Sequence, residues 1–346
     1  MNRVIIIFLS FFLINSSIGQ SNIVPEASKY ICPPCNNACD EIEYEHPGVC
    51  SHCNMVLVKK NDSKTIAFYL QDGVEVLDFA GPMEVFSYAG YKVFTVSATK
   101  SPITSQGILK VVPDYSIEDA PKADILAFFG GNSNQATNNP KVIEWVKSQE
   151  DIQYHFSVCT GAFILAEADI LDGKTATTFH NALDNLEDSY PEIDVRKNVR
   201  FVDNGKVITT AGISAGIDGA LHLVAKLQGL NAAKRTAYYM EYDNWNIGDG
   251  LVLSDDNPYD NQISTKELQA YMGKYEFGEG MQIEVTVDAE VKTLYAMFEG
   301  IAHPLYHENK DIFSDETNSP VYFKRDDNGN ILGYARSENG ELFKKL

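Results

Sequence analysis

Residues 152–170 read Ile-Gln-Tyr-His-Phe-Ser-Val-Cys-Thr-Gly-Ala-Phe-Ile-Leu-Ala-Glu-Ala-Asp-Ile. The apolar run 152–158 is typical of a buried strand, and the stretch from Gly161 onward has helical spacing. Cys159 therefore stands at a strand-to-helix turn, where Gly161 leaves room for a sharp bend that exposes a nucleophile. The free N–H groups of the following helix would stabilise a thiolate there. The alternative interpretation is a buried cysteine that acts as a small hydrophobic side chain.

The sequence on both sides of this turn alternates between strand-like and helix-like segments from residue 65 to about 229. Short β-branched or aromatic runs occupy residues 66–70, 92–97, 125–129, 152–158 and 207–210. Helical spacing occurs at residues 83–89, 140–149, 161–170 and 217–228. This order predicts βαβ units and a mostly parallel sheet that helices cover on both faces, so residues 64–243 are expected to form an α/β domain.

The pattern changes after residue 243. Residues 244–264 are rich in turn formers and are predicted to be a linker. Residues 281–288 alternate between apolar and polar side chains, as a half-buried antiparallel strand does. Asn-Gly pairs at residues 328–329 and 339–340 mark turns, the first of them a hairpin. We therefore expect residues 265–346 to form a small all-β domain.

Length and charge narrow the function classes. A chain of 346 residues is too long for one ordinary core, and its net charge of −20 with no basic stripe argues against binding to nucleic acid. Arg3 precedes an apolar run at 4–14 and a polar stretch that contains Ser17 and Gly19. This layout predicts a signal peptide at residues 1–20, an exported protein (periplasmic or extracellular) and no membrane span in the mature chain.

Residues 29–60 contain five cysteines. Two Cys-x-x-Cys pairs, Cys32/Cys35 and Cys50/Cys53, have the spacing of two knuckles around one tetrahedral metal ion, for which zinc is the default and another transition metal the alternative. Cys39, His46 and His52 are alternative ligands. An Asn follows each pair, at positions 36 and 54, and tolerates the left-handed conformation that a knuckle requires. A disulfide framework is the competing interpretation, because an exported location favours one.

The middle of the chain resembles the PfpI/ThiJ superfamily, which has a class I glutamine-amidotransferase-like, flavodoxin-like fold. Five landmarks in the expected order carry this resemblance: residues 73–86 with Leu-Asp-Phe-Ala-Gly-Pro, the Gly130-Gly131 pair, Ser-Val-Cys-Thr-Gly at 157–161, Leu-Asp-Gly-Lys-Thr-Ala-Thr-Thr at 171–178, and Thr-Ala-Gly-Ile-Ser-Ala-Gly-Ile-Asp at 210–218. The motifs are most similar to those of isocyanide hydratases and of the sensor domains of AraC-type regulators.

The resemblance implies a cysteine nucleophile beside an acidic side chain from the first βα loop, which by residue match are Cys159 and Asp78. The backbone N–H groups of Gly131 and Thr160 are candidates for stabilising an oxyanion. Glu75 and His180 are secondary candidates. Phe179 fills the position where peptidases of this superfamily carry an imidazole, so peptidase activity is disfavoured.

The resemblance further implies a small electrophilic substrate, isocyanide-hydratase-like lyase or hydrolase chemistry, no cofactor at the cysteine, and a homodimer. Two alternatives stay open: a ligand- or redox-sensing stress protein without catalysis, and a metal-binding protein. Residues 30–33 and 46–58 resemble short heavy-metal-binding domains of bacterial efflux and exported proteins. Residues 271–277 resemble the start of lipocalin-like β-domains appended to exported hydrolases.

Overall fold

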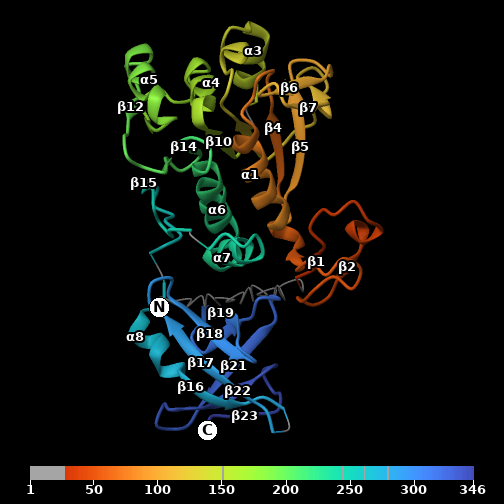
Figure 1. Ribbon diagram of the computed structural model, residues 1–346, viewed down its shortest axis with the longest axis vertical. Coiled ribbons are helices and arrows are strands. Elements are labelled where there is room, and N and C mark those ends of the chain that lie inside the picture. Colours follow the sequence, from red (N-terminus) through yellow and green to blue (C-terminus); the bar gives the residue numbers. More distant parts are fainter. Residues whose placement is uncertain (1–27, 150–151, 244, 261, 279) are drawn as a thin grey trace, which may run out of the picture.

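The protein is described here by a computed structural model, which covers residues 28–149, 152–243, 245–260, 262–278 and 280–346. The predicted signal peptide at residues 1–20 lies outside this range. Figure 1 shows three parts: a small N-terminal module, an α/β domain, and a C-terminal β domain below it. Within the described part of the chain, no helix combines the length and apolar character needed to cross a bilayer.

The α/β domain is built on an eight-stranded sheet with the order β15-β13-β14-β10-β9-β4-β5-β8. The strands are β4 (Thr65–Tyr69), β5 (Lys92–Ser97), β8 (Tyr115–Ser116), β9 (Ile125–Phe128), β10 (Tyr154–Val158), β13 (Phe201–Asp203), β14 (Val207–Thr210) and β15 (Leu251–Val252). All neighbours are parallel except β13 and β14, which confirms the predicted sheet. Because β4 is followed in the chain by β5 on one side and later by β9 on the other, a crevice forms at the carboxyl ends of β4 and β9.

Helices cover both faces of this sheet. Successive residues of β4 point to opposite faces of the sheet: Phe68 belongs to one apolar core and Tyr69 to the other. Helices α1 (Val76–Tyr88), α6 (Ala215–Gln228) and α7 (Leu230–Tyr239) contribute to the first core, and α3 (Pro140–Lys147) and α4 (Ala162–Glu167) to the second. The shorter elements are β6 (Ile103–Ser105), β7 (Leu109–Val111), α2 (Asn134–Thr137), η3 (Cys159–Gly161), β11 (Thr175–Ala176), η4 (His180–Ala182), α5 (Leu183–Ser189) and β12 (Asp194–Val195).

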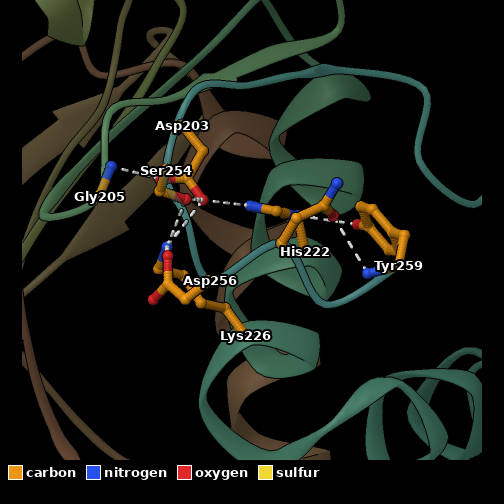
Figure 2. Close-up of polar contacts among 8 residues, drawn as sticks. Asp203, Gly205, His222, Lys226, Ser254, Asp256 and Tyr259 are labelled. Atoms are coloured by element: carbon orange, nitrogen blue, oxygen red, sulfur yellow. Dashed lines mark hydrogen bonds and ion pairs between the residues drawn. The ribbon is translucent and has the colours of Figure 1, made fainter. Parts of the chain in front are cut away.

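The segment predicted to be a linker, residues 244–264, is tied into the α/β domain instead of running free. It supplies strand β15, which pairs with β13, and a polar network fixes the residues that follow (Figure 2). The Asp203 carboxylate accepts hydrogen bonds from Lys226 Nζ at 2.9 Å and Ser254 Oγ at 3.2 Å, and it lies 2.8 Å from His222 Nε2. The other ring nitrogen of His222 lies 2.8 Å from the Tyr259 hydroxyl. Asp203 and His222 are fully buried, so the network holds the segment against α6.

The two smaller parts are made of short or antiparallel strands. The N-terminal module contains β1 (Tyr30–Ile31), η1 (Ala38–Glu41), β2 (Glu43–Tyr44), β3 (Val58–Lys59) and η2 (Lys60–Asp62). The C-terminal domain begins with α8 (Thr265–Leu268) and η5 (Gln269–Tyr271). Its eight antiparallel strands follow in chain order: β16 (Gly273–Glu276), β17 (Gln282–Asp288), β18 (Thr293–Phe298), β19 (Ile301–Asn309), β20 (Ile312–Ser314), β21 (Pro320–Arg325), β22 (Ile331–Ala335) and β23 (Phe343–Lys344).

The predicted all-β character of the C-terminal region is thus confirmed. A bridge between Tyr275 and Lys345 also joins the beginning and end of the meander. Helix α7 connects this domain to the α/β domain. Lys234 Nζ donates hydrogen bonds to the carbonyl oxygen of Val291 at 2.8 Å and to the Thr293 hydroxyl at 3.1 Å. A buried arginine one residue later, Arg235, donates to Ser314 Oγ at 2.8 Å. The two domains therefore share polar contacts between buried or half-buried groups.

Candidate active site and cysteine cluster

Cys159 lies at the carboxyl end of β10, one strand away from the crevice between β4 and β9. Its backbone φ is 58°, a left-handed conformation that is uncommon outside glycine and typical of strained functional turns. The next turn is possible because Gly161 has no side chain: a Cβ there would lie 2.4 Å from the carbonyl oxygen of Phe128. The Cys159 side chain is buried, with 5% of its surface exposed.

Asp78 lies in the first turn of α1 and is fully buried. Its position differs from the expectation of a loop residue, because α1 begins at Val76, seven residues before the predicted helix. One carboxylate oxygen, Oδ2, accepts a hydrogen bond from the backbone N–H of Gly130, and Oδ1 accepts one from that of Ile213, both at 2.9 Å. Two N–H donors from different loops therefore hold the carboxyl group in place.

The Asp78 carboxyl group and the Cys159 thiol meet at Gly130. A Cβ on Gly130 would lie 2.7 Å from Asp78 Oδ2 and 2.7 Å from Cys159 Sγ. The oxygen and the sulfur are consequently no more than twice that distance apart, on either side of a glycine that leaves the space between them free. Only glycine fits at this position without displacing one of the two groups.

Burial and mutual contact shift the ionisation of both groups. Burial raises the pKa of Cys159 to about 12, and the charge of Asp78 acts in the same direction. The N–H groups of Thr160 and Gly131 lower this pKa, because they stabilise negative charge on sulfur. Burial also raises the pKa of Asp78 to about 6, against the effect of its N–H donors from Ile213 and Gly130. At neutral pH the proton of the pair therefore resides mainly on sulfur and the negative charge mainly on the carboxylate.

The two backbone groups expected to stabilise an oxyanion both point at the sulfur. Gly131 follows β9 with a φ of 87°, and a Cβ on it would lie 2.3 Å from the carbonyl oxygen of Gly73. Thr160 follows Cys159 directly, and its hydroxyl is 3.4 Å from the Gly131 carbonyl oxygen. The Gly131 and Thr160 N–H groups can therefore bind negative charge that develops at or next to Sγ.

The secondary candidates lie further out. His180 is exposed, and its ring packs on that of Phe179 with 4.3 Å between centroids. Among the described residues, no histidine ring forms a hydrogen bond with Cys159. Glu75 is the residue before α1, where it accepts a hydrogen bond from Gln106, and its charge raises the pKa of Asp78. The site is therefore an acid–thiol pair without an imidazole.

Three contributors were not identified from the sequence. Gly130 was seen only as part of a glycine pair, and Ile213 only as part of a landmark, yet both donate to Asp78. Ile213 has a φ of 58°, which is rare for a β-branched residue and indicates a constrained loop. Phe179 and Cys159 Sγ both lie next to Gly212, where a Cβ would be 2.6 Å from the ring and 3.4 Å from the sulfur. The glycine at 212 was the available signal for this close packing.

The cysteine cluster differs in one ligand from the predicted set. Sγ atoms of Cys32, Cys39, Cys50 and Cys53 all lie within 4.8 Å of one another, which fits a single tetrahedral ion. Cys35, assigned to the first set by its spacing, lies instead in a second group with Cys32, Cys39 and Asp40. The N-terminal module can therefore hold a metal ion.

Other features of the module agree with a metal knuckle. Asn36 and Asn54 have φ values of 58° and 60°, which confirms the left-handed residue expected after each Cys-x-x-Cys pair. All six cysteines of the chain are free thiols in this structure. His46 and His52 are exposed and belong to neither ligand group.

Comparison with known proteins agrees with this geometry. A family model described as DJ-1/PfpI matches residues 64–226. Isonitrile hydratase from Pseudomonas putida is 34% identical over 180 residues, which are 51% of this chain and 78% of the hydratase. The chain belongs to the DJ-1/PfpI family. The match includes β4 to most of α6, and with them Asp78, Gly130 and Cys159.

Other DJ-1/PfpI relatives have different roles. The HTH-type transcriptional regulator CdhR from Pseudomonas aeruginosa is 29% identical over 174 residues, or 48% of this chain and 52% of the regulator, so the match spans about half of that protein. A solved ThiJ/PfpI family structure from Pseudomonas syringae is 29% identical, with a TM-score of 0.49 and coverage of 52% of this chain and 76% of that one.

Residues 257–337 match a second family model, described as a domain of unknown function (DUF3471).

Proposed function

We propose that the α/β domain is a cysteine-dependent hydratase for small, slender electrophiles, of which an isocyanide is the best example. The observation that carries this proposal is the pairing of Asp78 and Cys159 across Gly130, with no histidine hydrogen-bonded to the thiol among the described residues. Because only 5% of the Cys159 surface is exposed, the proposal requires a substrate with a narrow reacting end, such as the terminal carbon of an isocyanide, in place of a branched peptide carbonyl.

The protonation state of the pair suits addition to an isocyanide. Cys159 Sγ forms a bond to the terminal carbon while the Asp78 carboxylate accepts the thiol proton and delivers it to the same carbon, giving a thioimidate, Cys–S–CH=N–R. Water then adds to this carbon, a proton moves to nitrogen, and the C–S bond breaks with return of a proton to sulfur. The sum is R–NC plus water giving the formamide R–NH–CHO, and no free thiolate is needed beforehand.

The backbone donors have a defined part in this sequence. Partial negative charge develops on sulfur as its proton moves to Asp78 during attack, and on the oxygen of the added water as the tetrahedral intermediate loses its proton and breaks down. The N–H groups of Gly131 and Thr160 are already directed at Sγ, so they stabilise both species without rearrangement. The left-handed Cys159 backbone keeps the sulfur facing these donors.

The test is formation of N-cyclohexylformamide from cyclohexyl isocyanide by the purified protein, compared with the variants Cys159→Ala, Asp78→Asn and Glu84→Gln. Glu84 is an exposed carboxylate on the same helix as Asp78 and serves as the matched control. We expect Cys159→Ala and Asp78→Asn to lose turnover and Glu84→Gln to retain it. Because the carboxylate form of Asp78 accepts the proton, kcat/KM should rise with pH through about 6 in the wild type. Turnover that survives Cys159→Ala would exclude the mechanism.

The structure favours this function over redox sensing through Cys159. A readily oxidised thiol is exposed and has a lowered pKa, whereas burial raises the pKa of Cys159 to about 12. Peroxide treatment followed by mass spectrometry of the Cys159 peptide separates the two. Sulfenate formation faster than at a free cysteine would support the sensor instead.

We also propose that Cys32, Cys39, Cys50 and Cys53 bind zinc as a structural ion. Four sulfur ligands in a closed, tetrahedral arrangement are typical of structural zinc sites, and three of these cysteines are buried. The ion would supply folding energy to a module of only three two-residue strands. Metal analysis of the reduced full-length protein tests this, and a protein that purifies and refolds without metal would contradict it.

Export and dimerisation complete the proposal. The apolar run at 4–14 supports a signal peptide at residues 1–20, and cell fractionation together with N-terminal sequencing of the mature protein tests it. The expected homodimer rests on the family, and light scattering of the purified protein measures it. A monomer at working concentration would remove the dimer from the proposal and leave the active site unaffected.

A further inference from the structure

The N-terminal module contains one more thiol than a single tetrahedral ion uses. Two groups of four ligand atoms are present: Cys32, Cys39, Cys50 and Cys53 form one, and Cys32, Cys35, Cys39 and Asp40 form the other. In each group all four atoms lie within 4.8 Å of one another. The groups share Cys32 and Cys39, so they resemble two tetrahedra joined along an edge.

We propose that this module binds two zinc ions, with the Cys32 and Cys39 thiolates bridging them. The inference rests on the proposed zinc site and extends it with a second position made by Cys35 and Asp40. Cys50 and Cys53 are the terminal ligands of the first ion.

Burial fits these roles. The two shared residues, Cys32 and Cys39, are 3% and 1% exposed, as expected for sulfur atoms enclosed between two ions. Cys35 and Cys53, terminal ligands at opposite ends, are half-buried, while the third terminal cysteine, Cys50, is fully buried. Each group contains one close sulfur pair, at 3.2 Å for Cys32–Cys53 and 3.4 Å for Cys35–Cys39.

Asp40 is already held in place for ligation. Its Oδ2 accepts a hydrogen bond from the backbone N–H of Asn36 at 2.9 Å, and its Oδ1 accepts one from that of Cys35 at 3.1 Å. The Cys35 thiol also donates to Asp40 Oδ1, with a sulfur–oxygen distance of 3.0 Å. This thiol proton occupies the space between two ligand atoms, and a metal ion would displace it to water on binding.

The backbone gives an independent reason to include Cys35. The left-handed Asn36 completes the turn after Cys35 in the same way that Asn54 completes the turn after Cys53. A single ion bound by Cys32, Cys39, Cys50 and Cys53 would leave the second cysteine of a fully formed knuckle without metal. With two ions, both Cys-x-x-Cys pairs use all of their sulfur atoms.

Charge points the same way. If all five thiols ionise, the thiolates and Asp40 carry six negative charges, and one divalent ion would leave four of them uncompensated among buried and half-buried groups. Two divalent ions halve that residual charge. A mixed set of three sulfurs and one oxygen suits a borderline ion such as Zn²⁺ or Co²⁺ better than Cu⁺, which prefers sulfur alone.

The experiment measures bound metal per chain in the reduced full-length protein after incubation with Zn²⁺ and removal of excess ion. We expect two zinc ions in the wild type and in the Cys159→Ala control, and one in Cys35→Ser and in Asp40→Asn. Asp40→Asn keeps all five cysteines of the module, so it distinguishes loss of a ligand from loss of the fold. Co²⁺ provides a second readout: bridging thiolates couple the two ions magnetically, so the second equivalent should weaken the electron paramagnetic resonance signal of the first.

Each outcome decides one question. One zinc in the wild type, unchanged in Cys35→Ser, overturns the second site and leaves the proposed zinc site intact. Two zinc ions in the wild type that persist in both Cys35→Ser and Asp40→Asn place the second ion elsewhere and also overturn the inference. No bound zinc removes both proposals.

Discussion

Replacing Asp78 by asparagine should change how the stability of the α/β domain depends on pH. Asp78 is fully buried, and burial raises its pKa from an ordinary 3.8 to about 6. Below about pH 4 the carboxyl group is protonated in both folded and unfolded protein. Between about pH 4 and 6 it ionises only in the unfolded protein, which favours unfolding as the pH rises. Above pH 6 the difference is constant.

The size of this effect follows from the two pKa values. A tenfold change in an equilibrium corresponds to about 1.4 kcal/mol, so a rise from 3.8 to about 6 costs the folded state about 3 kcal/mol at neutral pH. Asparagine cannot ionise and removes this cost. It also weakens one of the two backbone hydrogen bonds, but that loss does not depend on pH. The stability of Asp78→Asn relative to the wild type should therefore increase by about 2.4 kcal/mol between pH 4 and pH 7, most of the total of about 3 kcal/mol.

Tryptophan fluorescence during urea unfolding can measure this quantity for the α/β domain alone. The chain has two tryptophans, Trp145 and Trp245, and both pack in the cores of that domain. Glu84→Gln on the exposed side of α1 is the control and should follow the wild type at every pH. A difference between Asp78→Asn and the wild type that stays constant from pH 4 to pH 8 would refute the raised pKa. The proposed role of Asp78 as a proton carrier near neutral pH would then lose its basis.

Three further predictions concern the site and its surroundings. Gly130→Ala should slow alkylation of Cys159 by iodoacetamide about a hundredfold, because the new methyl group displaces the thiol or the carboxyl group. Peptide-resolved mass spectrometry measures the alkylation rate, and an unchanged rate would contradict the close packing at Gly130. Asp203→Asn should lower the free energy of unfolding by about 3 kcal/mol, because it removes the ion pair with the buried Lys226 side chain. Urea titration measures this free energy, and a loss below about 1 kcal/mol would show that water replaces the network. Lys234→Met should loosen the C-terminal domain, seen as faster limited proteolysis after residue 243 with unchanged tryptophan fluorescence; equal cleavage rates would contradict this.

The sheet and the nucleophile turn were predictable because their signals are local. Buried parallel strands appear as short apolar runs, and the small residue two positions after Cys159 marks a tight turn. The start of α1 was missed by seven residues, since Gly81 and Pro82 interrupt its pattern. Pro82 is the seventh residue of α1, where its missing N–H removes the hydrogen bond to the Asp78 carbonyl, and its buried ring lies close to Gly216 of α6.

The rest depends on contacts between distant segments. Asp78 receives N–H groups from Gly130 and Ile213, which lie 52 and 135 residues away in sequence. No spacing rule predicts such contacts. The same applies to Cys39: its spacing from Cys35 fits no knuckle, yet the short η1 helix turns it toward Cys32, Cys50 and Cys53. Regular Cys-x-x-Cys spacing identified the module, and it placed Cys35 in the first group with Cys39 as an alternative, whereas the structure has Cys39 in that group and Cys35 in the second.

The anchored segment between α7 and the C-terminal domain sets a practical limit on dissecting this protein. The change in composition near residue 243 suggests a seam at which the gene could be divided. A fragment cut there would lose β15, Ser254 and Tyr259, leaving an unpaired sheet edge and a buried carboxylate with fewer donors. A fragment that ends after Asp260 keeps all three. Recombinant halves, or chimaeras with other members of the family, should be joined at that later position.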